Sequence, residues 1–147
     1  MKYMTFDHGN LTAFDAVGFL EDYSFNKAMV QSLEERIQDI RDYSMSVRYD
    51  GDRVQTSGIS DPTAELATLS VNLEEKKLWY EFWLQQCDKS LALLQEDDRF
   101  LLNVFYIDKA DSPVYVAMDK LGMEKSNVYR LRKAAIQKFS DLMVGKL

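Results

Sequence analysis

Apolar residues recur at alternating steps of three and four along two long segments of the chain. The first segment runs from Asn26 to about Val47, and its stripe consists of Val30, Leu33, Ile37 and Ile40. The second runs from Ser60 to about Gln95, and its stripe consists of Leu66, Leu69, Leu73, Tyr80, Trp83, Cys87, Leu91 and Leu94. Such steps place side chains on one face of an α-helix. The spacing therefore predicts two long, coiled-coil-like helices, paired as an antiparallel hairpin within one chain or across a homodimer.

The remaining segments complete the predicted organisation of an all-α chain. Residues 48–60 contain two glycines and several polar turn formers, so we expect a flexible connector that ends where Ser60 caps the second helix. Residues 1–25 form a leader, in which one short amphipathic helix is predicted from the spacing of Phe14, Val17, Leu20 and Phe25. We thus expect three parts: the leader 1–25, a helical hairpin or oligomerisation segment 26–95, and a C-terminal domain 96–147.

Composition and single residues exclude several classes of protein. No window approaches the roughly 18 apolar residues of a membrane span, and the start, MKYMTFDHGN, lacks the apolar run of a secretion signal. We therefore expect a cytoplasmic protein without a membrane partner. Cys87 and His8 are the only cysteine and histidine, too few for a disulfide or a zinc site. With no glycine-rich phosphate loop and no nucleophile beside a histidine, we predict no metal, no cofactor, no catalytic residues and no enzymatic activity.

The last third of the chain contains short helical patterns that meet at a glycine. The apolar residues from Phe100 to Ile107 predict one short helix after the acidic run Glu96–Asp98, and Ser112-Pro113 begins another. In this second helix Val116, Ala117 and Leu121 are expected to face inward, and Gly122 provides the left-handed residue of a sharp turn. A third helix is predicted from Glu124 or Lys125, with one face lined by Val128, Leu131, Ala135, Phe139 and Leu142. This pattern is typical of a helix-turn-helix.

The charges of the chain are distributed unevenly. Residues 109–147 hold eight Lys or Arg and four acidic residues, a net charge of +4, whereas residues 1–108 carry −10. Because phosphate repels an acidic chain, only the C-terminal part is suited to nucleic acid. The asymmetry predicts a module that faces double-stranded DNA, attached to an acidic part that faces protein partners.

Polar and basic side chains of the third helix are the predicted DNA-binding site. Arg130 has the geometry to donate two hydrogen bonds to guanine, Asn127 to pair with adenine, and Tyr129 to contact a thymine methyl or a phosphate. Lys125 and Ser126 lie near the helix N-terminus that would enter the major groove. The predicted phosphate contacts are Arg132, Lys133 and Lys138.

These motifs resemble a known family, the phage-encoded transcriptional regulators of the autolysin-regulator (ArpU) type, akin to RinA-like late-gene activators. The resemblance lies in Ser57–Ala64, Leu101–Ile107 and Val114–Phe139, and with the helical spacer it covers residues 27–144. The C-terminal part of these regulators resembles region 4 of sigma factors. Two positions depart from the pattern: Met118 stands where a small residue is usual, and Glu124 stands in place of the usual serine cap.

The resemblance implies a sequence-specific regulator of transcription, of phage or prophage origin, that binds upstream of a promoter and contacts RNA polymerase. Two alternatives fit the same residues. A small terminase-like DNA packaging factor also combines a helix-turn-helix with oligomerising helices. A protein–protein interaction module would use the helix-turn-helix as a scaffold and never touch DNA.

Overall fold

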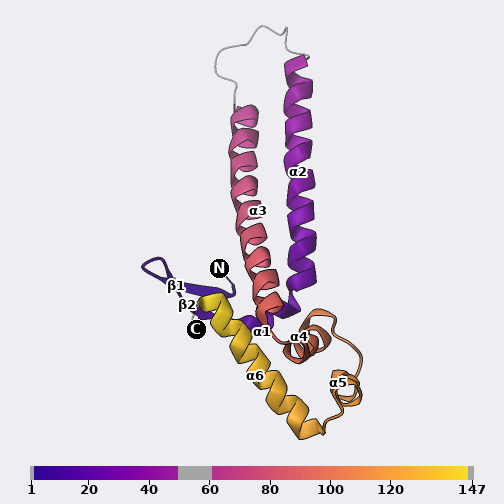
Figure 1. Cartoon of the computed structure of the whole chain (residues 1–147). Coiled ribbons are helices and arrows are strands. Elements are labelled where there is room, and N and C mark those ends of the chain that lie inside the picture. The colour runs from indigo at the N-terminus through magenta and orange to yellow at the C-terminus, as the bar shows by residue number, and fades with distance from the viewer. Residues whose placement is uncertain (1, 50–60, 146–147) are drawn as a thin grey trace. The chain divides into compact units, whose positions relative to one another are not determined.

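The computed structural model describes residues 2–49 and 61–145, and within them it is predominantly α-helical, as predicted. The elements follow in the order β1 (Met4–Asp7), β2 (Asn10–Phe14), α1 (Ala16–Glu21), α2 (Tyr23–Tyr49), α3 (Asp61–Leu93), α4 (Glu96–Leu102), the π-helical η1 (Asn103–Ile107), α5 (Pro113–Leu121) and α6 (Lys125–Val144) (Figure 1). The connector was predicted to begin at Arg48, but α2 continues through Arg48 to Tyr49. The rest of the predicted connector, including the Ser60 cap, lies outside the described residues. No helix in the described part of the chain is long and apolar enough to cross a membrane.

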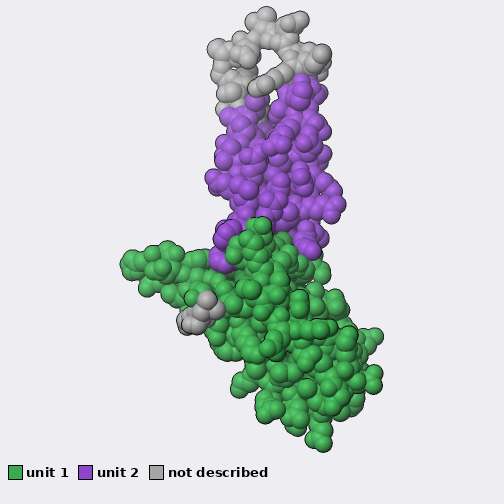
Figure 2. Space-filling model, viewed as in Figure 1, with its two compact units in different colours: residues 1–25, 84–147 green, residues 26–83 purple. Residues whose placement is uncertain are grey.

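The chain divides into two compact units (Figure 2). Unit 1 comprises Met1–Phe25 and Leu84–Leu147, and unit 2 comprises Asn26–Trp83. The N-terminal leader and the C-terminal helices therefore belong to the same unit, although the whole of unit 2 separates them in sequence.

Unit 2 is an antiparallel pair of helices formed by α2 and α3, which lie side by side (Figure 1). Its core joins Leu33 and Ile37 of α2 to Leu73 of α3, with Met29, Ile40 and Tyr80 packed around them. Ion pairs flank this core: Arg41 lies 2.8 Å from Glu74, and Lys77 lies 3.8 Å from Glu34. The two predicted long helices are therefore confirmed, and residues of both stripes meet within one chain.

The face that α3 turns toward α2 differs in one respect from the predicted stripe. Leu69 is 43% exposed, so its assignment to the buried stripe is wrong. The less exposed positions of α3 include Leu66, Ser70, Leu73, Lys77 and Tyr80, which follow one another at steps of four and three. Lys77 is only 24% exposed because its aliphatic stem lies along the helix pair while its ammonium reaches carboxylates at the rim. A prediction based on apolar residue types alone therefore omits Ser70 and Lys77 and includes Leu69 instead.

In unit 1 the other elements pack around α6. This helix contacts α1, β2, α4 and α5, and its side chains Val128, Ala135 and Phe139 are completely buried. Near its N-terminal end, Val128 meets Leu101 of α4 and Ala117 of α5 in a second hydrophobic core. Near its C-terminal end, the ring of Phe139 lies 6.0 Å from that of Phe14 in β2.

The leader folds as a β-hairpin followed by α1, so the predicted short helix is present but its bounds are wrong: Phe14 lies in β2 and Phe25 in α2. β1 and β2 are antiparallel, with Asp7 opposite Asn10, and both residues of the turn, His8 and Gly9, have positive φ (48° and 81°). Two positive φ values are characteristic of the tight hairpin turn that matches the twist of paired strands. Only Ala16–Glu21 adopts the expected helix.

Aromatic packing attaches the hairpin to the rest of unit 1. Phe14 lies 5.6 Å, centroid to centroid, from Phe19, which is itself 1% exposed. The hydroxyl of Tyr3 donates to Asp22 at 2.5 Å, and the ammonium of Lys2 donates to the same carboxylate at 3.1 Å. These two hydrogen bonds lower the pKa of Asp22 below its usual value. The strand pair is thus held against α1 and α6 at its open end, where Met4 pairs with Phe14.

We predict that Phe14→Ala destabilises unit 1, because it leaves a cavity between Phe19 and Phe139. The expected loss in the free energy of unfolding is about 2–4 kcal/mol, reduced from a full core truncation because Phe14 is half-buried. Phe25→Ala is the matched control: that ring is 65% exposed, and its removal should change stability by less than about 0.5 kcal/mol. Urea denaturation followed by circular dichroism measures both. Equal effects would show that the hairpin does not support the helical part of unit 1.

Candidate nucleic-acid interface

A left-handed glycine sets the direction of α6 relative to α5. Gly122 has φ 63° and ψ 37°, and its N–H donates to the carbonyl of Met118 at 2.9 Å. Glu124 then follows in an extended conformation, without a side-chain capping bond, and α6 begins at Lys125. The positions predicted for the turn and for the start of the third helix are therefore confirmed.

A small residue allows α5 and α6 to pack closely. Ala117 is 0% exposed and meets Leu101 and Val128, while Met118 and Leu121 pack around this contact. The predicted inward position of Val116 is wrong, since this residue is 40% exposed. The buried arc of α5 is centred on Ala117, with Leu121 one turn later, and Val116 lies outside it. The departure noted at Met118 is thus compensated by the alanine immediately before it.

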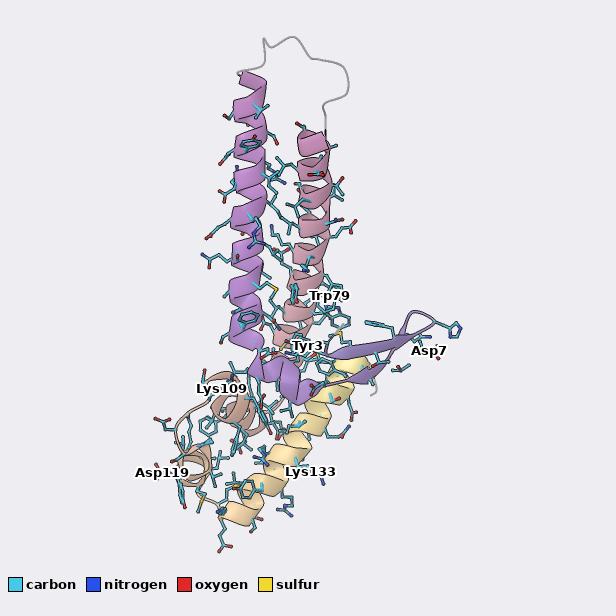
Figure 3. The ribbon with its side chains drawn as sticks, turned by 180° about the vertical axis from the view of Figure 1, so that it is seen from behind. Tyr3, Asp7, Trp79, Lys109, Asp119 and Lys133 are labelled. Atoms are coloured by element: carbon cyan, nitrogen blue, oxygen red, sulfur yellow. The ribbon has the colours of Figure 1, made fainter. Side chains whose placement is uncertain are left out.

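The face of α6 opposite this core is polar and basic. Val128 and Ala135 are completely buried, whereas Lys125, Ser126, Asn127, Arg130 and Lys133 are exposed and Tyr129 is 37% exposed. Figure 3 shows Lys133 on α6 and Asp119 on the side of α5 that points away from it. Along its 20 residues α6 carries five basic side chains and a single acid, Asp141.

The basic side chains on this exposed face lack acidic partners. Ion pairs occur at Lys2, Arg41, Lys77 and Lys138, but within the ranges that the structure describes none involves Lys125, Arg130 or Lys133. The nearest polar contact is within the face itself, where Nη2 of Arg130 donates to Oδ1 of Asn127 at 3.3 Å. The positive charge of these side chains is therefore free to be neutralised by an external anion.

Two of the predicted phosphate contacts are held by other side chains. The ammonium of Lys138 lies 3.0 Å from the carboxylate of Asp98, a side chain that is only 3% exposed. The guanidinium of Arg132 lies between the rings of Phe105 and Tyr129, 4.9 Å from each centroid. The structure therefore brings six of the eight predicted residues together on the exposed face, and it places Lys138 and Arg132 in contacts with other elements of unit 1.

Sequence reasoning missed Phe105 as a neighbour of this face. It belongs to the π-helical η1, and the predicted short helix assigned it to the core. No residue pattern marks a π-helical turn, although such turns often occur at functional sites. The spacing of Lys125, Tyr129 and Arg132 is visible in the sequence and places them along one flank of α6. The contact of Arg132 with Tyr129 could thus have been predicted from their spacing on α6, whereas its contact with Phe105 of η1 could not.

The candidate interface consists of hydrogen-bond donors and acceptors, positive charges and aromatic rings. In the described part of the chain, no group of three or more His, Cys, Asp or Glu side chains is arranged to hold a metal ion. Cys87 is completely buried, as predicted for a small core residue. Comparison of the chain with protein-family models, curated proteins and solved structures finds no match.

We predict that Gly122→Ala destabilises the protein by about 1–2 kcal/mol, because a left-handed conformation forces Cβ toward the following carbonyl. No atom outside the local chain lies within 4 Å of an added Cβ, so the loss of stability would come from backbone strain and not from a steric clash. Gly122→Asn is the control, since asparagine tolerates this conformation better, and it should recover a large part of the loss. If alanine and asparagine are equally harmful in thermal denaturation, the positive φ is not the cause.

We predict that Lys138→Met lowers the free energy of unfolding by about 1–3 kcal/mol, because it leaves the buried Asp98 carboxylate without its partner. Lys133→Met removes the same charge from the exposed face and should cost less than about 0.5 kcal/mol. Asp98→Asn in the Lys138→Met background should restore part of the stability, which a double-mutant cycle in urea measures. No coupling between residues 98 and 138 would contradict a structural role for Lys138.

Proposed function

We propose that this chain binds double-stranded DNA through α6 as a sequence-specific regulator of transcription of the phage or prophage type. In this proposal α5, the Gly122 turn and α6 act as a helix-turn-helix, with α6 as the recognition helix. The observation that carries it is the exposed basic face of α6, whose Lys125, Arg130 and Lys133 form no ion pair with any described acidic residue and which lies opposite a buried face. A phosphate backbone is the polyanion that such a face fits best.

The side chains near the start of α6 are suited to reading bases. A major groove about 12 Å wide admits an α-helix, and the exposed Lys125, Ser126 and Asn127 form the first turn of this one. The amide oxygen of Asn127 has two lone pairs, so it can accept from Arg130 and from adenine together. Arg130 retains further donors for guanine, and Lys133 lies one turn later for a phosphate.

The predicted RNA polymerase and homodimer contacts would require an additional surface. Unit 2 offers exposed apolar side chains on α3, namely Val71, Leu78 and Phe82, which are 53%, 64% and 50% exposed. Their spacing of seven and four residues places them along one side of the helix. These residues are the first to substitute if the regulator proves to act through a protein partner.

Selection of fragmented genomic DNA on the purified protein at moderate salt, followed by sequencing of the retained fragments, tests the proposal. Enrichment of one short site beside a promoter supports a transcriptional regulator and provides its operator. Enrichment at a packaging-type site would favour a terminase-like factor instead. Retention of no DNA by the folded protein would overturn DNA binding and favour a protein-interaction module.

We predict that Arg130→Ala and Lys133→Ala weaken DNA binding. If Lys133 contacts a phosphate, its removal should reduce the slope of log K against log salt by roughly one unit. Arg130→Ala should instead relax sequence preference at one position. Fluorescence anisotropy across a salt series measures both effects.

Lys89→Ala is the matched control for these variants. It removes one exposed positive charge from α3, outside the α6 face, and leaves the unit otherwise unchanged. We expect its salt slope to equal that of the parent protein. A slope that falls equally for Lys89→Ala and Lys133→Ala would indicate a general charge effect and would contradict the assignment of α6.

A further inference from the structure

Arg132 occupies an unusual position for a residue on a basic helix. Its guanidinium carbon is 4.9 Å from the ring centroid of Phe105 in η1 and equally far from that of Tyr129, one turn earlier on α6. The side chain is half-buried, and its Nε is buried without a hydrogen-bond partner. Among the residues that the structure describes, no carboxylate forms an ion pair with it. Cation–π contacts with two rings therefore hold this side chain.

The same stack restrains Tyr129. The ammonium of Lys125 lies 5.9 Å from the Tyr129 ring, so the ring has a cation four residues before it and another three residues after it. A guanidinium is planar and stacks flat against an aromatic ring, whereas an ammonium is a compact point charge. Arg132 is thus the partner that fixes the plane of the ring, and Phe105 fixes Arg132.

We propose that Arg132 is a positioning residue for Tyr129, and that Tyr129 contacts a base edge in the major groove. This inference rests on the proposed function. Tyr129 is 37% exposed and borders the face that carries Arg130 and Lys133, so a ring held in one orientation there meets DNA without first losing rotational freedom. A thymine methyl is the group that such an apolar ring edge would recognise. Arg132 thereby acts on specificity through a neighbour and is not a phosphate contact.

The experiment compares Arg132→Lys, Arg132→Ala, Tyr129→Leu and the double variant of Arg132→Lys with Tyr129→Leu, each measured by anisotropy on the selected site and on unrelated DNA. Arg132→Lys keeps the positive charge and loses the planar stack. We expect it to reduce the ratio of specific to non-specific affinity by roughly tenfold, the size of one lost base contact, with the salt slope unchanged. Tyr129→Leu should cause a similar loss, and the double variant should lose no more than Tyr129→Leu alone.

A measurement on the free protein tests the stack independently of DNA. If the guanidinium lies between two rings, nuclear magnetic resonance should show the Cδ protons of Arg132 shifted upfield by ring currents, and Phe105→Leu should reduce that shift. Circular dichroism and urea denaturation of each variant establish that it is folded. An Arg132 side chain with unshifted protons would overturn the proposal whatever the DNA-binding result.

Three binding results would also overturn it. An unchanged specificity ratio in Arg132→Lys, with a salt slope lower by one unit in Arg132→Ala, would make Arg132 a phosphate contact. A further loss on adding Arg132→Lys to Tyr129→Leu would show that the two residues act separately. If the parent protein retains no DNA, the proposed function fails together with this inference, whereas failure confined to the Arg132 variants leaves DNA binding by α6 intact.

Discussion

The buried face of α6 is the constraint on which unit 1 depends. Val128, Ala135 and Phe139 have no exposed surface, and α1, β2, α4 and α5 all contact this helix. A helix with one completely buried face must present its remaining side chains to solvent. The packing that stabilises unit 1 therefore also determines which side chains of α6 are displayed. Stability and the proposed recognition surface are two sides of one helix, and a change on the inner side alters the outer side as well.

The two ends of α6 are supported by segments that lie far apart in the sequence. Leu101 and Ala117 meet it near Val128, close to its N-terminal end, whereas Phe14 meets Phe139 near its C-terminal end. The first 25 residues are therefore part of the structure that holds the proposed recognition helix. A separate DNA-binding module cut at residue 96 would lose the contact that covers Phe139, and its buried ring would be exposed to water.

The sequence predicted those elements that depend on short-range patterns, namely apolar spacing and turn residues. The two long helices, the turn at Gly122 and the start of α6 follow from apolar spacing and from one glycine with positive φ. The β-hairpin was missed because the prediction for the leader used the apolar spacing of three from Phe14 to Leu20, whereas the hairpin turn depends on positive φ values at His8 and Gly9. The π-helical η1 and the Lys138–Asp98 ion pair depend on tertiary contacts between residues distant in sequence. No residue pattern on α6 alone distinguishes Lys138, which is paired, from Lys133, which is not.

The distribution of ion pairs also explains how a chain with a net negative charge could bind DNA phosphates, as proposed. The protein carries a net charge of −6, yet electrostatic interactions between exposed charges are largely screened beyond about 8 Å at physiological salt. What a phosphate would meet at α6 is therefore the local charge, and in the described structure no carboxylate lies within 4.0 Å of the charged groups of Lys125, Arg130 and Lys133. On α2 and α3, by contrast, Arg41 and Lys77 are neutralised by glutamates within 4 Å. Two cations between α2 and α3 are thus paired, whereas Lys125, Arg130 and Lys133 on the exposed face of α6 form no ion pair among the described residues.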